Sequence, residues 1–207
     1  MLGKHLLSPN YVYHRSRAAL YHRREGDNCP NLALGAVDFL RGWLRPTDTM
    51  LEYGSGGSTR WFAQRVGRLV SVEDSKFWYT KVKAELSGFT NVEYHLFDEP
   101  IDSAVGELGA SNAKAGWPYV NFIKSGPPEY FDVVLNDGWA RHRIAIESIV
   151  RLKRGGILVF DDHDVPELEE ISKRDEILAS FLSAVGDWRR VSWRDGSLHK
   201  TCCFFKP

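Results

Sequence analysis

The chain has few cysteines, and their placement narrows its class. Only three occur among 207 residues, at Cys29 and at the adjacent positions Cys202 and Cys203. An odd number with two neighbouring members argues against a disulfide framework and favours a reducing, cytoplasmic setting. Because neighbouring residues of a strand point to opposite faces, Cys202 and Cys203 are predicted to be buried small side chains, with no metal or redox function.

The chain also lacks an excess of either charge and lacks a membrane-spanning segment. Lys and Arg number 27, Asp and Glu number 27, and the formal net charge is zero. The chain as a whole is therefore no electrostatic match for nucleic acid or an anionic membrane. No apolar run approaches the roughly 20 residues that cross a bilayer, and the first residues carry no contiguous apolar segment typical of a secretory signal. The expected partner is a small molecule.

Acidic residues are missing from the start of the chain, where none precedes Glu25. We interpret residues 1–29, which are basic and aromatic, as an N-terminal arm lying over the core. A lid over a ligand, or a surface for an anionic substrate, is the alternative. The length suits one well-cored domain and is short for two, so residues 1–207 are expected to form a single domain.

A glycine-rich turn is the most informative stretch that is present. Residues 49–53 predict a short apolar strand, and a helix is expected to begin near Ser58. Between them, Gly54, Gly56 and Gly57 let the backbone turn tightly and approach a ligand closely. The N–H groups that open the helix would face that ligand.

A carboxylate follows this turn at a sequence separation that is typical of nucleotide-binding folds. The next predicted strand ends in Glu73, nineteen residues after Gly54, about where nucleotide-binding folds place the acid that binds ribose hydroxyls. Two features separate the stretch from a dinucleotide fingerprint. The third glycine of that motif would fall at Thr59, and an acid, Glu52, precedes the first glycine.

Apolar periodicity predicts alternating helices and strands along the chain. Helices are expected over 31–44, 58–66, 75–87, 139–153 and 166–185, and strands over 49–53, 69–73, 91–97, 131–136, 157–160, 188–193 and 199–205. Asp195-Gly196 joins the last two strands, and so short a link permits only an antiparallel hairpin. The order predicts an α/β fold, a Rossmann-like doubly wound sheet of about seven strands, mostly parallel with an antiparallel C-terminal hairpin strand.

Residues 99–130 lack this periodicity and predict a long loop or insertion. A connection of that length inside a compact domain is commonly functional or flexible. Its aromatic centre, residues 117–122, is the candidate for substrate contacts. An insertion packed on the surface fits the same residues equally well.

The string Glu52-Tyr-Gly-Ser-Gly-Gly-Ser-Thr59, with Glu73 ending the next strand, resembles the first two motifs of class I S-adenosylmethionine-dependent methyltransferases. Among them it looks closest to small bacterial methyltransferase-like proteins that carry E-Y-G-S-G-G-S-T. The terminal hairpin agrees, because the seventh strand of that family inserts antiparallel. The resemblance spans residues 30–207 and implies S-adenosyl-L-methionine as cofactor, with methyl transfer to oxygen or nitrogen of a small-molecule acceptor.

The resemblance also assigns cofactor-binding residues at the carboxyl ends of the strands. Glu52 would address the methionine ammonium, Glu73 both ribose hydroxyls, and Asp98 the adenine amino group. The remaining expected contacts are Tyr53, Gly54, Ser55, Gly56, Ser58, Thr59, Asp74 and Asp137.

The run Asp137-Gly-Trp-Ala-Arg141 would fill the family motif beside the point of methyl transfer. Asp137 is expected to orient the acceptor, take its proton or contact the cofactor. His142 and His163 are further candidates for the base, since a near-neutral pKa suits proton transfer, although a lone histidine is more often structural. Arg141 suggests a carboxylate or phosphate on the substrate, or only a helix surface.

A metal site is a separate hypothesis, built on Asp137, Asp161 and Asp162. These positions resemble the carboxylates of metal-dependent catechol- and caffeoyl-type O-methyltransferases, and three carboxylates can hold Mg²⁺ or Ca²⁺. That group usually has a lysine two residues after the first Asp, where this chain has Trp139. We therefore expect no metal.

Two other functions stay open. One is a nicotinamide-dependent oxidoreductase, against which Glu52, Thr59 and the terminal hairpin all argue. The other is a protein that binds S-adenosylmethionine without transferring its methyl group. Nothing in the sequence excludes the second.

Overall fold

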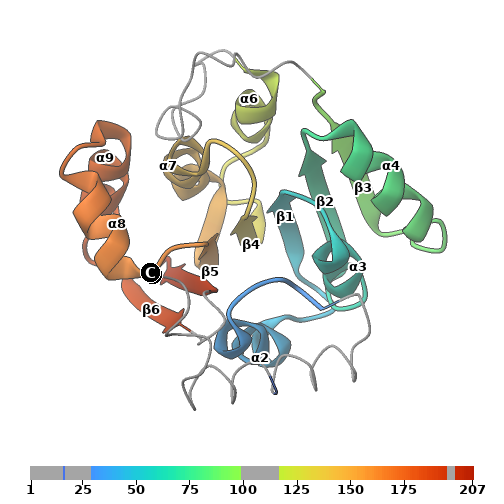
Figure 1. Cartoon of the computed structure of the whole chain (residues 1–207), viewed down its shortest axis with the longest axis horizontal. Coiled ribbons are helices and arrows are strands. Elements are labelled where there is room, and N and C mark those ends of the chain that lie inside the picture. Colours follow the sequence, from blue (N-terminus) through green and yellow to red (C-terminus); the bar gives the residue numbers. More distant parts are fainter. Residues whose placement is uncertain (1–15, 17–28, 99–116, 195–198) are drawn as a thin grey trace, which may run out of the picture.

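The computed structural model describes residues 16, 29–98, 117–194 and 199–207. Its centre is one seven-stranded sheet with the order β3-β2-β1-β4-β5-β7-β6 (Figure 1). The strands are β1 (Thr49–Tyr53), β2 (Arg68–Glu73), β3 (Val92–Leu96), β4 (Phe131–Asn136), β5 (Leu152–Asp161), β6 (Arg189–Arg194) and β7 (Lys200–Phe205). Most of the expected N-terminal arm, residues 99–116 of the expected loop and the Asp195-Gly196 turn lie outside the described residues.

Strand directions confirm the predicted sheet. The strands from β1 to β5 pair in parallel, and β7 runs antiparallel to both of its neighbours, β5 and β6. The strand order reverses between β1 and β4. In open α/β sheets a crevice for ligands opens at this point, beyond the carboxyl ends of the strands.

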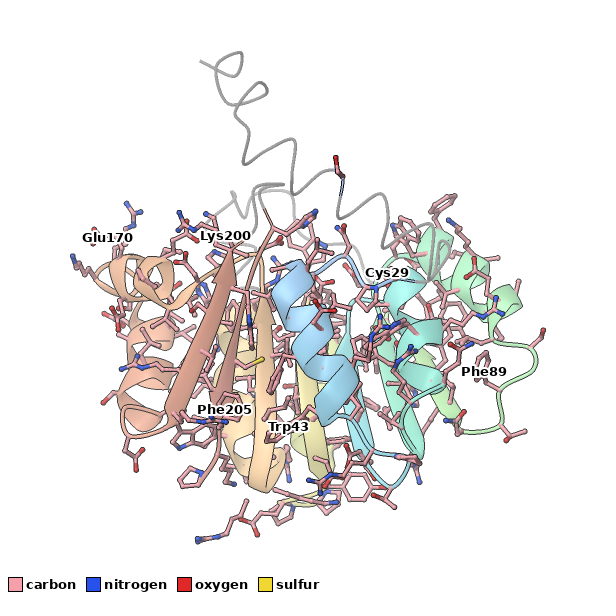
Figure 2. The ribbon with its side chains drawn as sticks, turned by 90° about the horizontal axis from the view of Figure 1, so that it is seen from below. Cys29, Trp43, Phe89, Glu170, Lys200 and Phe205 are labelled. Carbon is pink, nitrogen blue, oxygen red and sulfur yellow. The ribbon has the colours of Figure 1, made fainter. Side chains whose placement is uncertain are left out.

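Helices cover both faces of the sheet. One face carries α2 (Leu34–Trp43), α3 (Gly57–Ala63) and α4 (Lys76–Glu85), and the other carries α6 (Pro118–Ser125), α7 (Arg141–Arg151), α8 (Val165–Ser172) and α9 (Glu176–Ala184). Figure 2 shows α2 lying across the sheet, and its Trp43 meets Phe205 of β7 edge to face with ring centroids 5.5 Å apart. Within the described ranges, no helix has both the length and the apolar character that a bilayer crossing demands.

The two adjacent cysteines confirm the side-chain alternation of β7. Cys202 packs in the core beneath α7 and α9, whereas Cys203 packs in the core beneath α2. Both are fully buried free thiols, and burial raises the pKa of each well above its ordinary value. They are packing residues, as the sequence predicted.

The boundary between α7 and β5 differs most from the sequence-based expectation. Residues 154–156 were expected to end a helix, but β5 already begins at Leu152. Gly155 has a φ of 74°, and the pairing of β4 with β5 shifts register between Phe131 and Val133. The glycines therefore serve an irregularity inside a strand.

The single helix expected over 166–185 is two helices, α8 and α9. Asp175 separates them, because its Oδ1 accepts hydrogen bonds from the backbone N–H groups of Ile177 and Leu178. This is an N-cap, which starts a new helix at Glu176. The apolar spacing runs through both helices and gave no sign of the break.

Part of the expected loop over 99–130 is helical. Pro118 opens α6, a position where its missing N–H has no cost. Tyr119, Val120 and Ile123 are buried in the core beneath the sheet. The aromatic run at 117–122, a candidate for substrate contacts, therefore packs α6 against the sheet.

Tyr53 of β1 ties α6 to the centre of the sheet. Its buried hydroxyl donates to the carbonyl of Tyr119 and accepts from the N–H of Ile123, both at 3.1 Å. These two backbone groups are four residues apart, so the hydroxyl is inserted into one turn of the helix. The Tyr119 ring meets Tyr53 edge to face at 5.0 Å, and the Tyr119 hydroxyl has no partner among the described residues.

Replacing Tyr53 with Phe should lower the free energy of unfolding by about 1 kcal/mol, because two buried backbone groups lose the hydroxyl that joins them. Urea denaturation measures the change. Tyr119→Phe is the matched control: it removes a buried hydroxyl that has no partner and should leave stability unchanged or raise it. Equal losses in both variants would contradict the assignment.

Candidate functional site

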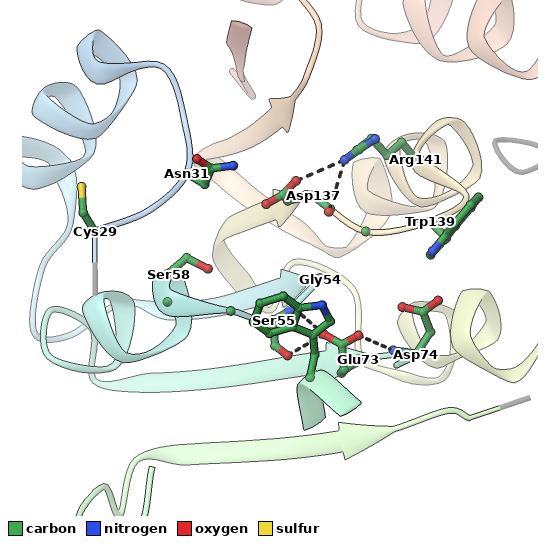
Figure 3. Close-up of a pocket in the computed structure, with 14 residues that line it drawn as sticks. Cys29, Asn31, Gly54, Ser55, Ser58, Glu73, Asp74, Asp137, Trp139 and Arg141 are labelled. Atoms are coloured by element: carbon green, nitrogen blue, oxygen red, sulfur yellow. Dashed lines mark hydrogen bonds and ion pairs between the residues drawn. The ribbon is translucent and has the colours of Figure 1, made fainter. Parts of the chain in front are cut away.

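A cavity of about 640 Å³ opens at the carboxyl ends of β1, β2 and β4. Its walls come from the loops that follow these strands and from the segment before α2 (Figure 3). The lining residues are Cys29, Asn31, Gly54, Ser55, Gly56, Gly57, Ser58, Glu73, Asp74, Trp78, Asp137, Gly138, Trp139 and Arg141. This is the crevice where the fold is expected to bind a ligand.

The loops after β1 and β4 touch each other backbone to backbone. Gly54 has a φ of 87°, and a Cβ added to it would lie 2.6 Å from the carbonyl oxygen of Asp137. A Cβ added to Gly138 would lie 1.9 Å from the Tyr119 hydroxyl. Glycine at 54 is therefore required by the contact between the loops and by its φ, before any ligand is considered. Gly56 is different, since no atom lies within 4 Å of its added Cβ.

Glu73 joins the loop after β1 to the loop after β2. Its Oε2 accepts from the N–H of Ser55 at 2.8 Å and from the Ser55 hydroxyl at 2.5 Å. Its Oε1 accepts from the N–H group of Asp74 at 3.1 Å (Figure 3) and from that of Ser75 at 2.8 Å. The Ser55 hydroxyl also contacts the Tyr94 hydroxyl, so it is the one donor that can turn away from Glu73. The carboxylate is thus fixed in place at the cavity wall, where it can accept from ligand hydroxyls.

Asp74 lies beside Glu73 at the cavity wall and is half-buried. Burial, and then repulsion from Glu73, raise its pKa to about 7. Near neutral pH its carboxyl group is therefore present in both protonation states. It can accept a hydrogen bond from a ligand or donate one.

Glu52 lies behind the cavity wall. It is fully buried, its Oε1 accepts from the Ser58 hydroxyl at 2.8 Å, and its Oε2 accepts from the Ser71 hydroxyl at 2.7 Å. Burial raises its pKa to about 7. Only Ser58 of this group lines the cavity, so Glu52 makes no direct contact with it. The expectation that Glu52 addresses a ligand ammonium through water stays a prediction.

Three further cofactor candidates lie off the cavity wall. The Thr59 hydroxyl accepts from the N–H of Gly56 at 3.0 Å and is buried, so it supports the glycine turn. The Tyr53 side chain packs beneath the sheet against α6. Asp98 is exposed just after β3 and does not line the cavity.

Arg141 holds the carboxylates at the β4 and β5 end of the cavity. Its Nη2 lies 3.1 Å from Oδ1 of Asp137 and 2.7 Å from Oδ2 of Asp162 (Figure 3 draws the first pair). Asp161 accepts from the Thr201 hydroxyl at 2.7 Å. Burial, and then repulsion from Asp161, raise the pKa of Asp137 well above its usual range, and burial raises that of Asp161 to about 6.

The structure brings the three predicted metal ligands together. One carboxylate oxygen from each of Asp137, Asp161 and Asp162 lies within 4.8 Å of the others. The guanidinium of Arg141 already supplies positive charge to two of them. The chain itself therefore offsets part of the negative charge of this cluster.

Two residues at or next to these carboxylates and Arg141 have a strained backbone conformation. Ala140 and Asp162 have φ values of 54° and 65°, in the left-handed region that residues with a Cβ rarely occupy. Of the described non-glycine residues, only Glu129 shares this property. Ala140 precedes α7, which starts with Arg141, and Asp162 follows β5, so the strained residues set the positions of both ends of the ion pair.

Neither candidate histidine lines the cavity. His142 is buried, and its Nδ1 lies 2.7 Å from Oδ2 of Asp175, the residue that caps α9. The Nδ1 of His163 faces the carbonyl of Asp161 at 3.4 Å, and burial lowers its pKa. We therefore correct the assignment of His142 as base: it joins α7 to α9.

Several lining residues escaped the sequence analysis. Trp78 of α4 is 42% exposed and lines the cavity. Cys29 and Asn31, in the segment before α2, also line the cavity. The sequence could have predicted that Trp139 lines the cavity, because it follows Asp137 by two residues.

No protein-family model matches the chain, and no curated protein matches it. Solved structures do. An O-methyltransferase from Bacillus cereus in complex with SAH is 14% identical, with a TM-score of 0.57, over 96% of this chain and 91% of that one. The O-methyltransferase TomG from Streptomyces achromogenes, involved in tomaymycin synthesis and in complex with SAM, is 18% identical, with a TM-score of 0.56, over 100% of both chains.

A methyltransferase-like protein from Silicibacter pomeroyi is 20% identical, with a TM-score of 0.53, over 86% of this chain and 89% of that one. Identities this low establish a shared fold. The chain thus shares the Rossmann-like fold of these proteins, and a shared fold does not assign roles to its residues.

Changing Glu52 to Gln should remove part of the pH dependence of stability. The folded-state pKa of about 7 lies above the unfolded value of 4.5, so the contribution of Glu52 is present below pH 4.5 and lost as the pH rises through 7. Between pH 5 and pH 8 the unchanged protein should lose about 2 kcal/mol more than Glu52→Gln, measured by urea denaturation across that range. Parallel curves for both proteins would refute the assignment. Glu93→Gln, at an exposed glutamate of β3, is the control.

Changing Gly138 to Ala should lower the free energy of unfolding by about 1–3 kcal/mol, because the new methyl group overlaps the Tyr119 hydroxyl. Adding Tyr119→Phe should restore part of the loss, since the hydroxyl is the closest atom. Gly56→Ala is the matched control and should cost little, because its φ of −178° suits any residue. Thermal unfolding measures all four proteins, and equal losses for Gly138→Ala and Gly56→Ala would contradict the packing described.

Proposed function

We propose that this chain is an S-adenosyl-L-methionine-dependent methyltransferase that acts on an oxygen or nitrogen atom of a small-molecule acceptor. The observation that carries the proposal is the position of Glu73. It is a buried carboxylate at the end of β2, fixed by both neighbouring loops at the wall of a 640 Å³ cavity. The fold is one found with bound SAM and SAH in other proteins.

The chemistry of the cavity wall fits this cofactor. Glu73 and Asp74 offer acceptors for ribose hydroxyls, Ser58 and Asn31 offer polar groups for an amino-acid part, and Gly56 exposes bare backbone. The carboxylates suit a cation such as a sulfonium or an ammonium.

The same wall suits a pyrophosphate poorly. Glu73 would face its negative charges, and Arg141, the one cation among the described residues of that wall, already pairs with Asp137 and Asp162. This is an electrostatic argument against the nicotinamide-dependent oxidoreductase, in addition to the sequence arguments.

S-adenosyl-L-methionine, when bound, would supply an electrophilic methyl group. We assign Asp137 to orient the acceptor and to take the proton of its O–H or N–H group, because this carboxyl lies at the cavity wall and burial raises its pKa. Arg141 is a positioning residue, since its guanidinium fixes the Asp137 carboxylate. No histidine is needed for this role.

Binding without transfer is the second candidate function. It is favoured by the ion pairs that Arg141 forms with both Asp137 and Asp162. These three side chains at the β4 and β5 end of the cavity are paired with one another without an acceptor substrate. Turnover across a panel of phenols, amines and carboxylates, each with labelled cofactor, separates the two functions.

Calorimetric titration with S-adenosylhomocysteine, NAD and NADP tests the cofactor. We expect binding of S-adenosylhomocysteine alone, and about tenfold or greater weakening by Glu73→Gln, since hydrogen bonds to a charged group contribute about 1.5–3 kcal/mol each. Glu93→Gln, whose side chain pairs with Arg68 away from the cavity, is the control and should bind as the unchanged protein does. Binding of a nicotinamide nucleotide alone would overturn the proposal.

We expect methyl transfer to be independent of a metal, because Arg141 already pairs with Asp137 and Asp162. We expect no saturable binding of Mg²⁺ or Ca²⁺ by calorimetry, and no effect of a chelator on methyl transfer. Arg141→Ala removes the compensating charge and should raise the affinity of Asp137, Asp161 and Asp162 for these cations. Saturable binding by the unchanged protein, abolished by Asp162→Asn, would prove the metal site instead.

A further inference from the structure

A second cavity, of about 480 Å³, lies between α3 and α4. Its lining residues, which define the α3–α4 groove, are Gly56, Gly57, Arg60, Trp78, Lys81, Val82 and Glu85. Gly56, Gly57 and Trp78 also line the first cavity, so the two cavities share a wall. The proposed methyl transfer makes no use of Arg60 or Lys81.

Two positive charges from different helices meet in this groove. Within the described ranges, neither Arg60 of α3 nor Lys81 of α4 has a carboxylate at ion-pair distance. The Nε of Arg60 is buried and has no hydrogen-bond partner there. By contrast, Arg68 at the start of β2 pairs with Glu93 at 2.6 Å.

Glu85 is the one acid on the groove wall, and it leaves these charges largely uncompensated. It follows Lys81 by four residues along α4, without forming an ion pair in the described part of the chain. A lysine placed before a glutamate at this spacing is also the weaker order for helix pairing. The groove therefore keeps a net positive charge.

The two cavities have opposite electrostatic character. Acids outnumber bases on the first, with Glu73, Asp74 and Asp137 against Arg141, whereas bases outnumber acids on the second, with Arg60 and Lys81 against Glu85. An anion would be repelled from the first cavity and attracted to the groove.

The remaining groove wall is aromatic and apolar. The Nζ of Lys81 lies 4.9 Å from the centre of the Trp78 ring, a cation–π contact that holds the lysine over that wall. Val82 is buried beside it. One water molecule occupies about 30 Å³ in the liquid. The groove, at about 480 Å³, therefore has room for an anionic group and for the rest of the molecule that carries it.

We propose that the α3–α4 groove binds a small phosphorylated molecule. Its phosphate would lie between Arg60, whose planar guanidinium matches two phosphate oxygens, and Lys81, which adds a point charge. Its body, aromatic or apolar, would pack on Trp78 and Val82. This inference does not rest on the identity of the ligand in the first cavity.

Calorimetric titration of the full chain with phenyl phosphate and with inorganic phosphate, at constant ionic strength in a phosphate-free buffer, tests the proposal. Phenyl phosphate should bind saturably and several-fold more tightly than inorganic phosphate. Arg60→Gln and Lys81→Gln should each weaken it by about tenfold, the usual loss for one charged hydrogen bond. Glu85→Gln should tighten it.

Lys76→Gln is the matched control, because Lys76 is an exposed lysine of α4 that does not line the groove. It should change the affinity less than twofold, and thermal unfolding should show every variant folded. The absence of saturable binding for both probes, or equal weakening by Lys76→Gln and Lys81→Gln, would overturn the proposal. So would complete displacement of phenyl phosphate by S-adenosylhomocysteine, which would place the probe in the first cavity.

Discussion

The site depends on one steric constraint, the contact of the β1 and β4 loops at Gly54 and Gly138. Adjacent parallel strands lie less than 5 Å apart, so the loops that leave their carboxyl ends must diverge or pack without side chains. This chain does the second, with Gly54 against the carbonyl of Asp137. The contact places Asp137 beside the glycine turn, and Glu73 then ties the turn to β2. The cavity walls follow from these two fixed points.

Much of the fold could be predicted, because strands buried on both faces leave continuous apolar runs and the glycine turn is local. The sequence identified β1, β2 and β4 for this reason, and the short Asp195-Gly196 link identified the terminal hairpin. It missed the break between α8 and α9, since a polar cap such as Asp175 interrupts a helix without disturbing the apolar stripe. It also missed α6, whose buried residues are interpretable only once Tyr53 is known to face them.

Some residues of the site could be predicted from the sequence and others could not, and the difference has a physical cause. Residues at strand ends, such as Glu73 and Asp137, were found because parallel strands bring their carboxyl ends to one edge. The side chains on which these residues depend were not. Nothing local reveals that Arg141 bridges Asp137 and Asp162, because that pairing joins the ends of two strands through α7.

The sheet ends at β6, and this strand has a consequence for solubility. An edge strand presents unpaired backbone groups on which another chain can add a strand. Here the edge bears Arg189, Arg190 and Arg194, and a second copy aligned on it would bring its own arginines into register with these. Charge repulsion along the outermost strand therefore discourages sheet-to-sheet association between copies. Arg190 and Arg194 also tie β6 to Glu169 and Asp164.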